Sequence, residues 1–235
     1  MQNIWPIYRK ELKSYFNSPV AYIVITVFLL ISGWFFATNF FLMGQATVRT
    51  ALSVIPLIFI VFTPAITMRS IAEEKKSGTI ELLVTMPTRD VEIVLGKFLA
   101  ALTLLAIALA FTLIYAITTS MLGNLDEGPT LAGYLGLLLV GAVYVAVGIF
   151  ASATSENQIV AFIISFLIIF VLFLLDKVLM FVPGPLVSLF EYLSVDYHFN
   201  SISRGVIDTR DIIYYLSMTT FALALAVRSL ESRKW

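Results

Sequence analysis

The residues that could do chemistry in this sequence are few. His198 is the only histidine and there is no cysteine, so the chain offers no thiolate nucleophile, no disulfide and no site with several histidine ligands for a metal. Asp196 and Asp208 lie in the same segment as His198. His198 with either of them could form the acid–base pair of an intramembrane or lipid-modifying enzyme, but a surface pair of His198 with Asp196 is the simpler interpretation. The sequence therefore predicts no metal site and no catalytic residue.

A nucleotide-binding motif is also missing from the sequence. A phosphate-binding loop needs two glycines five residues apart, the second followed by Lys and then Ser or Thr. Gly96-Lys97 is followed by Phe98 and has no glycine five residues earlier. We expect that the chain is not an enzyme and binds no cofactor itself, so that ATP and magnesium would belong to a partner. The net charge of zero gives no bulk attraction to nucleic acid.

Ten charged residues gather in the stretch 69–97. Gly78 interrupts this stretch, and Thr79 can then cap a short helix with Glu81 in its first turn. Thr88 is expected to cap the helix that follows. A short helix with apolar and acidic sides suits the docking of a soluble partner, whereas an ordinary solvated loop is the alternative.

Residues 3–17 predict an amphipathic helix at the membrane interface. On a helical wheel the aromatic and aliphatic residues share one half, and Arg9, Lys10 and Lys13 share the other. Glu11 is an exception on the apolar side, where we expect it to face a protein partner or to sit at the interface. The helix is either a generic membrane anchor or an elbow that also touches a cytoplasmic partner.

The elements that must position these segments are membrane helices. The chain is 60% hydrophobic and 13% charged, with a mean hydropathy of +0.95, whereas a soluble domain is about 25% charged. A helix needs about 20 residues to cross a bilayer, and six stretches without charged residues reach or approach this length. We predict one all-α integral membrane domain over residues 1–235. Its six transmembrane helices are expected at 20–43, 51–68, 98–122, 131–152, 159–180 and 212–229.

The distribution of Lys and Arg predicts the orientation of these helices. Six crossings put both termini on one side of the membrane, and that side carries eleven of the 15 basic residues, against four on the other. The positive-inside rule then places both termini and the loop 69–97 in the cytoplasm, and the segment 183–211 outside. The apolar core of the first helix is too long for a cleaved signal peptide, so we expect it to be retained.

Several strings of the sequence resemble the ABC-2 type permeases, the membrane subunits of ATP-binding-cassette transporters. They are KELKSYFNSPVAYIV, MRSIAEEKKSGTIELLVTMP, VLGKFLAA, GIFASATSENQIVAF and SISRGVIDTRDIIYYLS. The closest resemblance is to the gliding-motility permease branch (GldF-like), and next to the NosY-like permeases. The string most specific to the gliding branch supplies a periplasmic family motif: Ser203, Arg204, Gly205, Asp208, Arg210 and Asp211.

The resemblance implies that the loop between helices two and three carries a coupling helix that sits in a cleft of the ATPase. The matching positions are Glu73, Glu74, Gly78, Thr79, Glu81, Leu82 and Leu83. The elbow would flank the same contact through Tyr8, Arg9, Lys10, Glu11 and Lys13.

The resemblance also implies the setting of the chain. Two permease copies, as a homodimer, and two ABC ATPase subunits would form the working unit in the bacterial inner membrane. A GldG-like membrane protein with a large periplasmic domain can accompany them.

We expect a permease that couples ATP hydrolysis in a partner to transport or force transmission. Its substrate is expected to be hydrophobic, amphipathic or a polymer, because no charged residue falls in the middle of a predicted span. A NosY-like maturation permease and a scaffold that transports nothing are the alternatives, and an enzyme using His198 is a rival from another class.

Overall fold

The computed structural model describes residues 3–42, 47–79, 88–123, 125–178 and 184–232. The regular elements in these ranges are helices, and none of the described residues forms a strand. Six of the helices are long and apolar enough to cross a membrane, which confirms the predicted all-helical membrane fold.

The helices follow one another with short connections. In chain order they are α1 (Ile4–Asn17), α2 (Pro19–Ala37), the π-helix η1 (Thr38–Leu42), α3 (Arg49–Thr67), α4 (Ala72–Lys76), α6 (Asp90–Leu122), α7 (Glu127–Thr154), α8 (Gln158–Val178), α9 (Gly184–Leu193), α10 (Val195–Ile202) and α11 (Thr209–Glu231). The cytoplasmic helix expected after Thr88 and the third predicted span form one helix, α6. Its N-cap is Arg89 rather than Thr88, because the Glu92 carboxylate accepts a hydrogen bond from the Arg89 backbone N–H at 3.2 Å.

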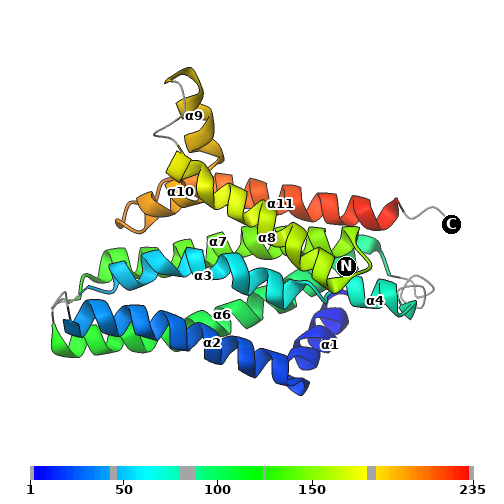
Figure 1. The fold of residues 1–235 in the computed structure, drawn as a ribbon, viewed down its shortest axis with the longest axis horizontal. Helices are drawn as coiled ribbons and strands as arrows, with labels where there is room; N and C mark the ends of the chain where they lie inside the picture. The colour runs from blue at the N-terminus through cyan, green and yellow to red at the C-terminus, as the bar shows by residue number, and fades with distance from the viewer. Residues whose placement is uncertain (1–2, 43–46, 80–87, 124, 179–183, 233–235) are drawn as a thin grey trace.

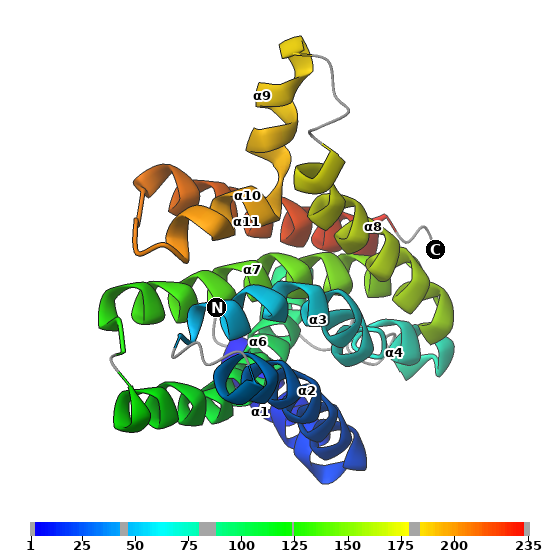
Figure 2. The same ribbon diagram turned by 60° about the vertical axis from the view of Figure 1, so that its left-hand side comes forward.

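Helix α7 is the centre of the bundle, and it packs against α3, α6, α8, α10 and α11 (Figures 1 and 2). Small residues on α7 permit this close approach. A Cβ built on Gly148 would lie 2.0 Å from the Thr67 Oγ1 of α3. The backbone of α7 can therefore reach α3 at this level only because residue 148 has no side chain.

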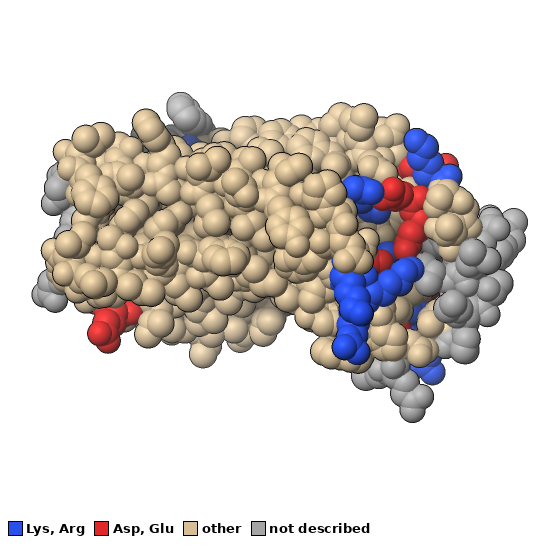
Figure 3. All heavy atoms as spheres, turned by 90° about the horizontal axis from the view of Figure 1, so that it is seen from below, with Lys and Arg blue, Asp and Glu red and all other residues tan. Residues whose placement is uncertain are grey.

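The outside of the bundle is apolar and matches a lipid environment. Large side chains such as Leu30, Trp34, Leu131 and Ile159 are mostly exposed, which in water would be unfavourable and in a bilayer is not. Figure 3 shows that the middle of one face carries no Lys, Arg, Asp or Glu, whereas charged residues gather at one end.

The two ends of the bundle differ in their short helices. Helices α1 and α4 and the C-terminal end of α11 lie at one end, which we name the α1–α4 end (Figure 1). The connection between α10 and α11 lies at the other end, which we name the α10 end, and α9 projects from the bundle beside α10. The described parts of the loop that was predicted to dock a partner, residues 69–79 and 88–97, lie at the α1–α4 end.

Candidate functional site

The start of α4 is held by α7. The Ser152 hydroxyl accepts hydrogen bonds from the backbone N–H groups of Ile71 and Ala72, both at 3.0 Å, and donates one to the Met68 carbonyl at 3.1 Å. Because no side chain of its own caps α4, Ser152 satisfies the backbone donors that a helix N-terminus leaves unpaired. The short helix is thus fixed to the centre of the bundle.

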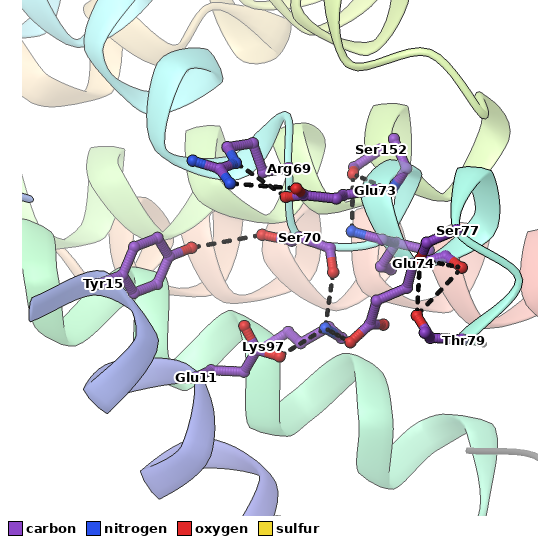
Figure 4. A network of polar contacts seen from close by, with 12 residues as sticks. Glu11, Tyr15, Arg69, Ser70, Glu73, Glu74, Ser77, Thr79, Lys97 and Ser152 are labelled. Atoms are coloured by element: carbon purple, nitrogen blue, oxygen red, sulfur yellow. Dashed lines mark hydrogen bonds and ion pairs between the residues drawn. The ribbon is translucent and has the colours of Figure 1, made fainter. Parts of the chain in front are cut away.

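A buried lysine joins three helices at the same end (Figure 4). The Lys97 ammonium of α6 lies 2.7 Å from the Glu11 carboxylate of α1 and 2.9 Å from the Glu74 carboxylate of α4, and it donates to the Ser70 carbonyl at 2.6 Å. All three ammonium protons therefore have acceptors. The Lys97 side chain is only 2% exposed, so removing Lys97 would leave two carboxylates without a counter-charge, which is costly. We name Glu11, Ser70, Glu74 and Lys97 the Lys97 cluster.

Beside the Lys97 cluster lies a cavity of about 320 Å³ between α1 and α4, lined by polar side chains that include Lys10, Ser14 and Thr79. The second oxygen of Glu74, Oε2, is buried and accepts no hydrogen bond from the described residues. The space between α1 and α4 is therefore polar and incompletely filled, in contrast to the apolar packing around α7.

An ion pair on the surface accompanies the buried one. The Arg69 guanidinium donates two hydrogen bonds to the Glu73 carboxylate, at 2.9 and 3.1 Å. Both side chains are more than 40% exposed, so water and salt screen this pair and it adds little stability. Glu73 therefore remains accessible on the outer side of α4, whereas Glu74 faces inward.

The chain turns sharply after α4 at Gly78, whose φ of +70° falls in the left-handed region that favours glycine. Ser77 and Thr79 share a hydrogen bond of 2.8 Å across this turn. The predicted coupling positions Glu81, Leu82 and Leu83, and the short helix expected after Thr79, lie outside the described residues. The structure thus places Glu73, Glu74, Gly78 and Thr79 of the predicted coupling set.

The predicted elbow is α1, and it lies against α6 and α2. Its backbone approaches α6 closely, since a Cβ on Gly96 would lie 2.7 Å from the Ile7 side chain. Arg9, Lys10 and Lys13 are exposed, and no acidic side chain among the described residues pairs with them. The Tyr8 hydroxyl accepts a hydrogen bond from Thr103 at 3.3 Å. Three cations on α1 therefore remain available to lipid or to a partner.

The last turn of α1 also binds the chain that leads into α4. The Tyr15 hydroxyl donates to the Ile66 carbonyl at 3.2 Å and lies 3.4 Å from the Ser70 hydroxyl. Burial raises the pKa of the Tyr15 phenol well above its usual range, and the Ser70 hydroxyl only partly offsets this. Tyr15 is therefore a neutral donor that connects α1 to the end of α3.

Two predictions about single residues are wrong. Glu11 faces neither the lipid interface nor an outside partner, because it is paired with Lys97 of the same chain. His198 does not form a surface pair with Asp196. It is buried and contacts the Asp211 carboxylate at 2.6 Å, whereas Asp196 pairs with Lys177 at 2.6 Å. The cause in each case is a tertiary contact that the sequence spacing does not reveal.

The predicted periplasmic motif is spread over the α10 end rather than gathered in one site. Ser203 is buried at the end of α10, and Gly205, with a φ of +88°, turns the chain after it. The Asp208 carboxylate caps α11 by accepting from the Arg210 N–H at 2.9 Å. Arg204 and the Arg210 side chain are exposed. Within the motif, Asp211 makes a buried polar contact with another side chain, the imidazole of His198.

Sequence reasoning missed Lys97 and Ser152 as members of the site. Lys97 was considered only as part of a failed phosphate loop and as one cytoplasmic charge. A signal was present, because the string VLGKFLAA surrounds this lysine with apolar residues, which favours a buried ammonium with partners. Ser152 had no comparable signal, since a serine near a helix end is common.

The comparison with protein families identifies one match. A model described as ABC-2 family transporter protein matches residues 41–227, more than half of the chain. The match includes α4 and Lys97 but not α1. A search of curated proteins found no match.

Proposed function

The chain belongs to the ABC-2 family of transporter proteins, and from this membership we propose that α4 and the residues after it receive movement from a separate ABC ATPase and pass it to the membrane helices. The family makes the chain a membrane permease of an ABC transporter, and it implies an ABC ATPase as partner. ATP would be hydrolysed in that partner, and this chain would contribute no catalytic residue.

One observation carries the proposal: α4 is tied to three other helices by buried polar contacts. Lys97 connects it to α1 and α6, and Ser152 connects it to α7. A displacement of α4 cannot leave these helices in place without breaking a buried ion pair or uncapping α4, and each of those changes is costly. The preferred response is that the connected helices move with α4.

The partner would meet the accessible side of this unit. Thr79 is exposed there, the Glu73 side chain is 46% exposed, and the exposed cations of α1 lie at the same end. Together they present acidic and basic side chains to a soluble subunit. In this proposal the segment 80–87, with Glu81, Leu82 and Leu83, contributes to the same contact.

We also propose the orientation and the assembly. The α1–α4 end would face the cytoplasm of a bacterial inner membrane, because eleven of 15 basic residues belong to that side. A second copy of the chain and a GldG-like subunit would complete a gliding-type complex, supported by the string SISRGVIDTRD. A NosY-like maturation permease or a non-transporting scaffold is the alternative, and the genes that flank this one would distinguish these systems.

The test is to reconstitute the permease with its ATPase and to measure both co-purification and ATP turnover. The informative variant is the triple change Glu11→Gln, Glu74→Gln, Lys97→Met, because it removes the ion pairs without leaving a buried unpaired charge. Arg49→Met is the matched control, since Arg49 is an exposed cation at the start of α3, beside Asn200 and Ser203 and away from the α1–α4 end.

We expect the triple variant to bind the ATPase as the wild type does, since Glu73 and the exposed side of α4 are unchanged. The effect of the permease on ATP turnover should fall several-fold, whereas Arg49→Met should retain it. A folded triple variant that alters turnover as much as the wild type would contradict coupling through the Lys97 cluster. If the ATPase hydrolysed ATP at the same rate with and without the permease, the result would instead favour a non-transporting scaffold.

A further inference from the structure

Helix α9 leaves the bundle sideways at the α10 end. In both views it runs across the long axis of the bundle, whereas the six long apolar helices run roughly along that axis (Figures 1 and 2). Its contacts with the rest of the chain are made mainly to α8 and α10. Because membrane-spanning helices stand close to the membrane normal, the axis of α9 lies roughly parallel to the plane of the membrane.

One face of α9 exposes large apolar side chains. Leu189, Tyr192 and Leu193 follow one another at i, i+3 and i+4, so they share one face of the helix, and they are 52%, 59% and 39% exposed. We name these three residues the α9 stripe. Ser188 and Glu191 lie on another side of the helix, and Glu191 is its only charged residue. Helix α9 is therefore amphipathic, with its apolar face turned away from the protein.

The depth of α9 matches the boundary of the membrane at this end. Charged residues reappear at Lys177 near the end of α8 and at Asp211 in the first turn of α11, and they mark the headgroup region because the hydrocarbon core excludes charge. Helix α10 lies at the same level, since its Asp196 pairs with Lys177 and its His198 contacts Asp211, both at 2.6 Å. Helix α9 is separated from α10 by Ser194 alone, so it extends from the bundle at this boundary.

The C-terminal end of α9 is fastened to α10 and α11. The Tyr192 carbonyl oxygen lies 3.1 Å from Nε2 of His198, and the Leu193 carbonyl accepts a hydrogen bond from the Tyr214 hydroxyl at 2.7 Å. Both carbonyls belong to the last turn of α9, where a helix leaves its acceptors unpaired. The Tyr192 ring also meets the His198 and Tyr214 rings edge to face. These contacts hold the direction of α9 through its own chain, whatever the α9 stripe touches.

We propose that α9 is an interfacial helix that binds the lipid surface at the α10 end, with the α9 stripe at the boundary between headgroups and acyl chains. Tyr192 suits this place, because a phenol combines an apolar ring with a polar tip and is enriched at membrane interfaces. Ser188 and Glu191 then face water. Since α9 is fastened to α11, the lipid surface fixes the depth at which α11 begins.

The neighbouring helix favours lipid as the occupant. Helix α8, against which α9 packs, exposes Leu167, Val171 and Val178 by 52%, 55% and 40%. These side chains belong to a membrane-spanning helix, so lipid is their natural surrounding. A helix that leaves the end of this surface in the plane of the membrane enters the same lipid.

The α9 stripe also predicts how the lipid is bound. It carries no charge, so burial of apolar area drives the contact. Added salt or anionic lipid should therefore leave the position of α9 unchanged. The three exposed cations of α1 should respond to both, because salt screens their attraction to anionic headgroups.

The absence of cysteine permits a test with a single nitroxide label on the full chain in phosphatidylcholine liposomes. Leu189→Cys and Leu193→Cys place the label on the α9 stripe, and Ser188→Cys is the matched control on another side of the same helix. Collisions with oxygen, which concentrates among acyl chains, and with a water-soluble nickel chelate measure the depth of each label.

We expect the ratio of oxygen to nickel collisions to be several-fold higher at positions 189 and 193 than at 188. This ratio corresponds to labels about 5–10 Å into the boundary between headgroups and acyl chains. Replacement of part of the phosphatidylcholine by phosphatidylglycerol, or added salt, should change none of the three ratios.

Three results would overturn the proposal. Nickel collisions as frequent at 189 and 193 as at 188 would place α9 in water. Rare collisions with both reagents at 189 and 193 would mean that protein covers the α9 stripe, and spin–spin broadening that disappears on dilution with unlabelled chain would identify that protein as a second copy. A ratio that falls with added salt would show that charge, rather than the apolar stripe, holds α9 to the lipid.

Discussion

Each end of the bundle has a buried nitrogen-bearing side chain that faces carboxylate and carbonyl oxygens from other helices, but the side chain differs. At the α1–α4 end it is Lys97, whose three donors are all used. At the α10 end it is His198, whose two ring nitrogens face the Asp211 carboxylate and the Tyr192 carbonyl. The Lys97 ammonium joins two carboxylates from different helices, whereas the His198 ring also stacks on Tyr214. The comparison teaches that ion pairs hold the α1–α4 end together, whereas an aromatic ring and its hydrogen bonds hold the α10 end together.

The largest effect should follow from removing Lys97. Lys97→Met leaves Glu11 and Glu74 facing each other without a counter-charge, and we expect it to lower the free energy of unfolding by about 3–5 kcal/mol. The measurement is SDS-induced unfolding in detergent micelles.

The triple variant Glu11→Gln, Glu74→Gln, Lys97→Met should recover most of this loss, and Lys10→Met should cost almost nothing. A Lys97→Met protein as stable as the Lys10→Met control would show that the Lys97 cluster is not a structural joint.

The tightness of packing around α7 can also be compared between the two ends, by substituting its glycines. A Cβ on Gly148 would meet Thr67 Oγ1 at 2.0 Å and Thr67 Cβ at 2.8 Å, so no rotamer of Thr67 removes the clash. A Cβ on Gly136, near α10, would meet Ile202 and Phe199 side-chain atoms at 3.0 and 3.1 Å, which small shifts can relieve. Gly148→Ala should therefore cost about 1–3 kcal/mol of unfolding free energy, and Gly136→Ala less.

The same unfolding assay measures both glycine variants. Gly128→Ala is the control, because a Cβ there meets nothing within 4 Å. Equal losses for Gly148→Ala and Gly136→Ala would mean that α7 is held no more tightly at the α1–α4 end than near α10.

A smaller effect is expected from Tyr15, which lies beside Ser70 of the Lys97 cluster. Tyr15→Phe removes the hydrogen bond to the Ile66 carbonyl and should cost about 0.5–1.5 kcal/mol. Because burial raises the pKa of the folded phenol, its stabilising contribution is complete below about pH 10, the usual pKa of tyrosine, and falls as the pH rises above it.

The measurement is the difference in unfolding free energy between the wild type and Tyr15→Phe across alkaline pH. The difference should shrink above about pH 10. Tyr8→Phe, which loses only an accepted hydrogen bond from Thr103, serves as control, and a difference that grows with pH would contradict the neutral, buried phenol.

The smallest effect should come from the exposed pair of Arg69 and Glu73. Glu73→Gln should change the unfolding free energy by less than about 1 kcal/mol, and added salt should reduce even that. The comparison with Glu74→Gln is sharp, since the two glutamates are neighbours but only Glu74 pairs with the buried lysine. If Glu73→Gln destabilised as strongly as Glu74→Gln, the distinction between an exposed and a buried side of α4 would be wrong.

The fold could be predicted from the sequence because its dominant signal is local. A run of uncharged residues is visible in any window, and lipid requires it wherever a helix crosses the membrane. The amphipathic pattern of 3–17 is equally local, so α1 was expected, although its inward-facing Glu11 was not understood.

The site could be predicted only in part because its contacts join distant parts of the chain. Glu11 and Lys97 are 86 residues apart, and Ile71 and Ser152 are 81 apart. No spacing rule relates such residues, since their pairing depends on how α1, α6 and α7 pack. His198 and Asp211 are only 13 residues apart, yet the turn at Gly205 that brings α10 back onto α11 has no distinctive sequence pattern.

The central claim is that movement of α4 is transmitted to the membrane helices through the Lys97 cluster. The absence of cysteine permits two spin labels at chosen positions. Leu42 of η1 and Met121 of α6 are both about 80% exposed and lie at the end of the bundle away from Lys97, so labels there would perturb neither the cluster nor the partner surface.

The measurement is the distance distribution between these two labels in the permease–ATPase complex, with and without a non-hydrolysable ATP analogue. The account predicts that the analogue shifts the distribution in the wild type. In the variant Glu11→Gln, Glu74→Gln, Lys97→Met it should leave the distribution unchanged, although the ATPase stays bound. The same shift in that variant would contradict the account.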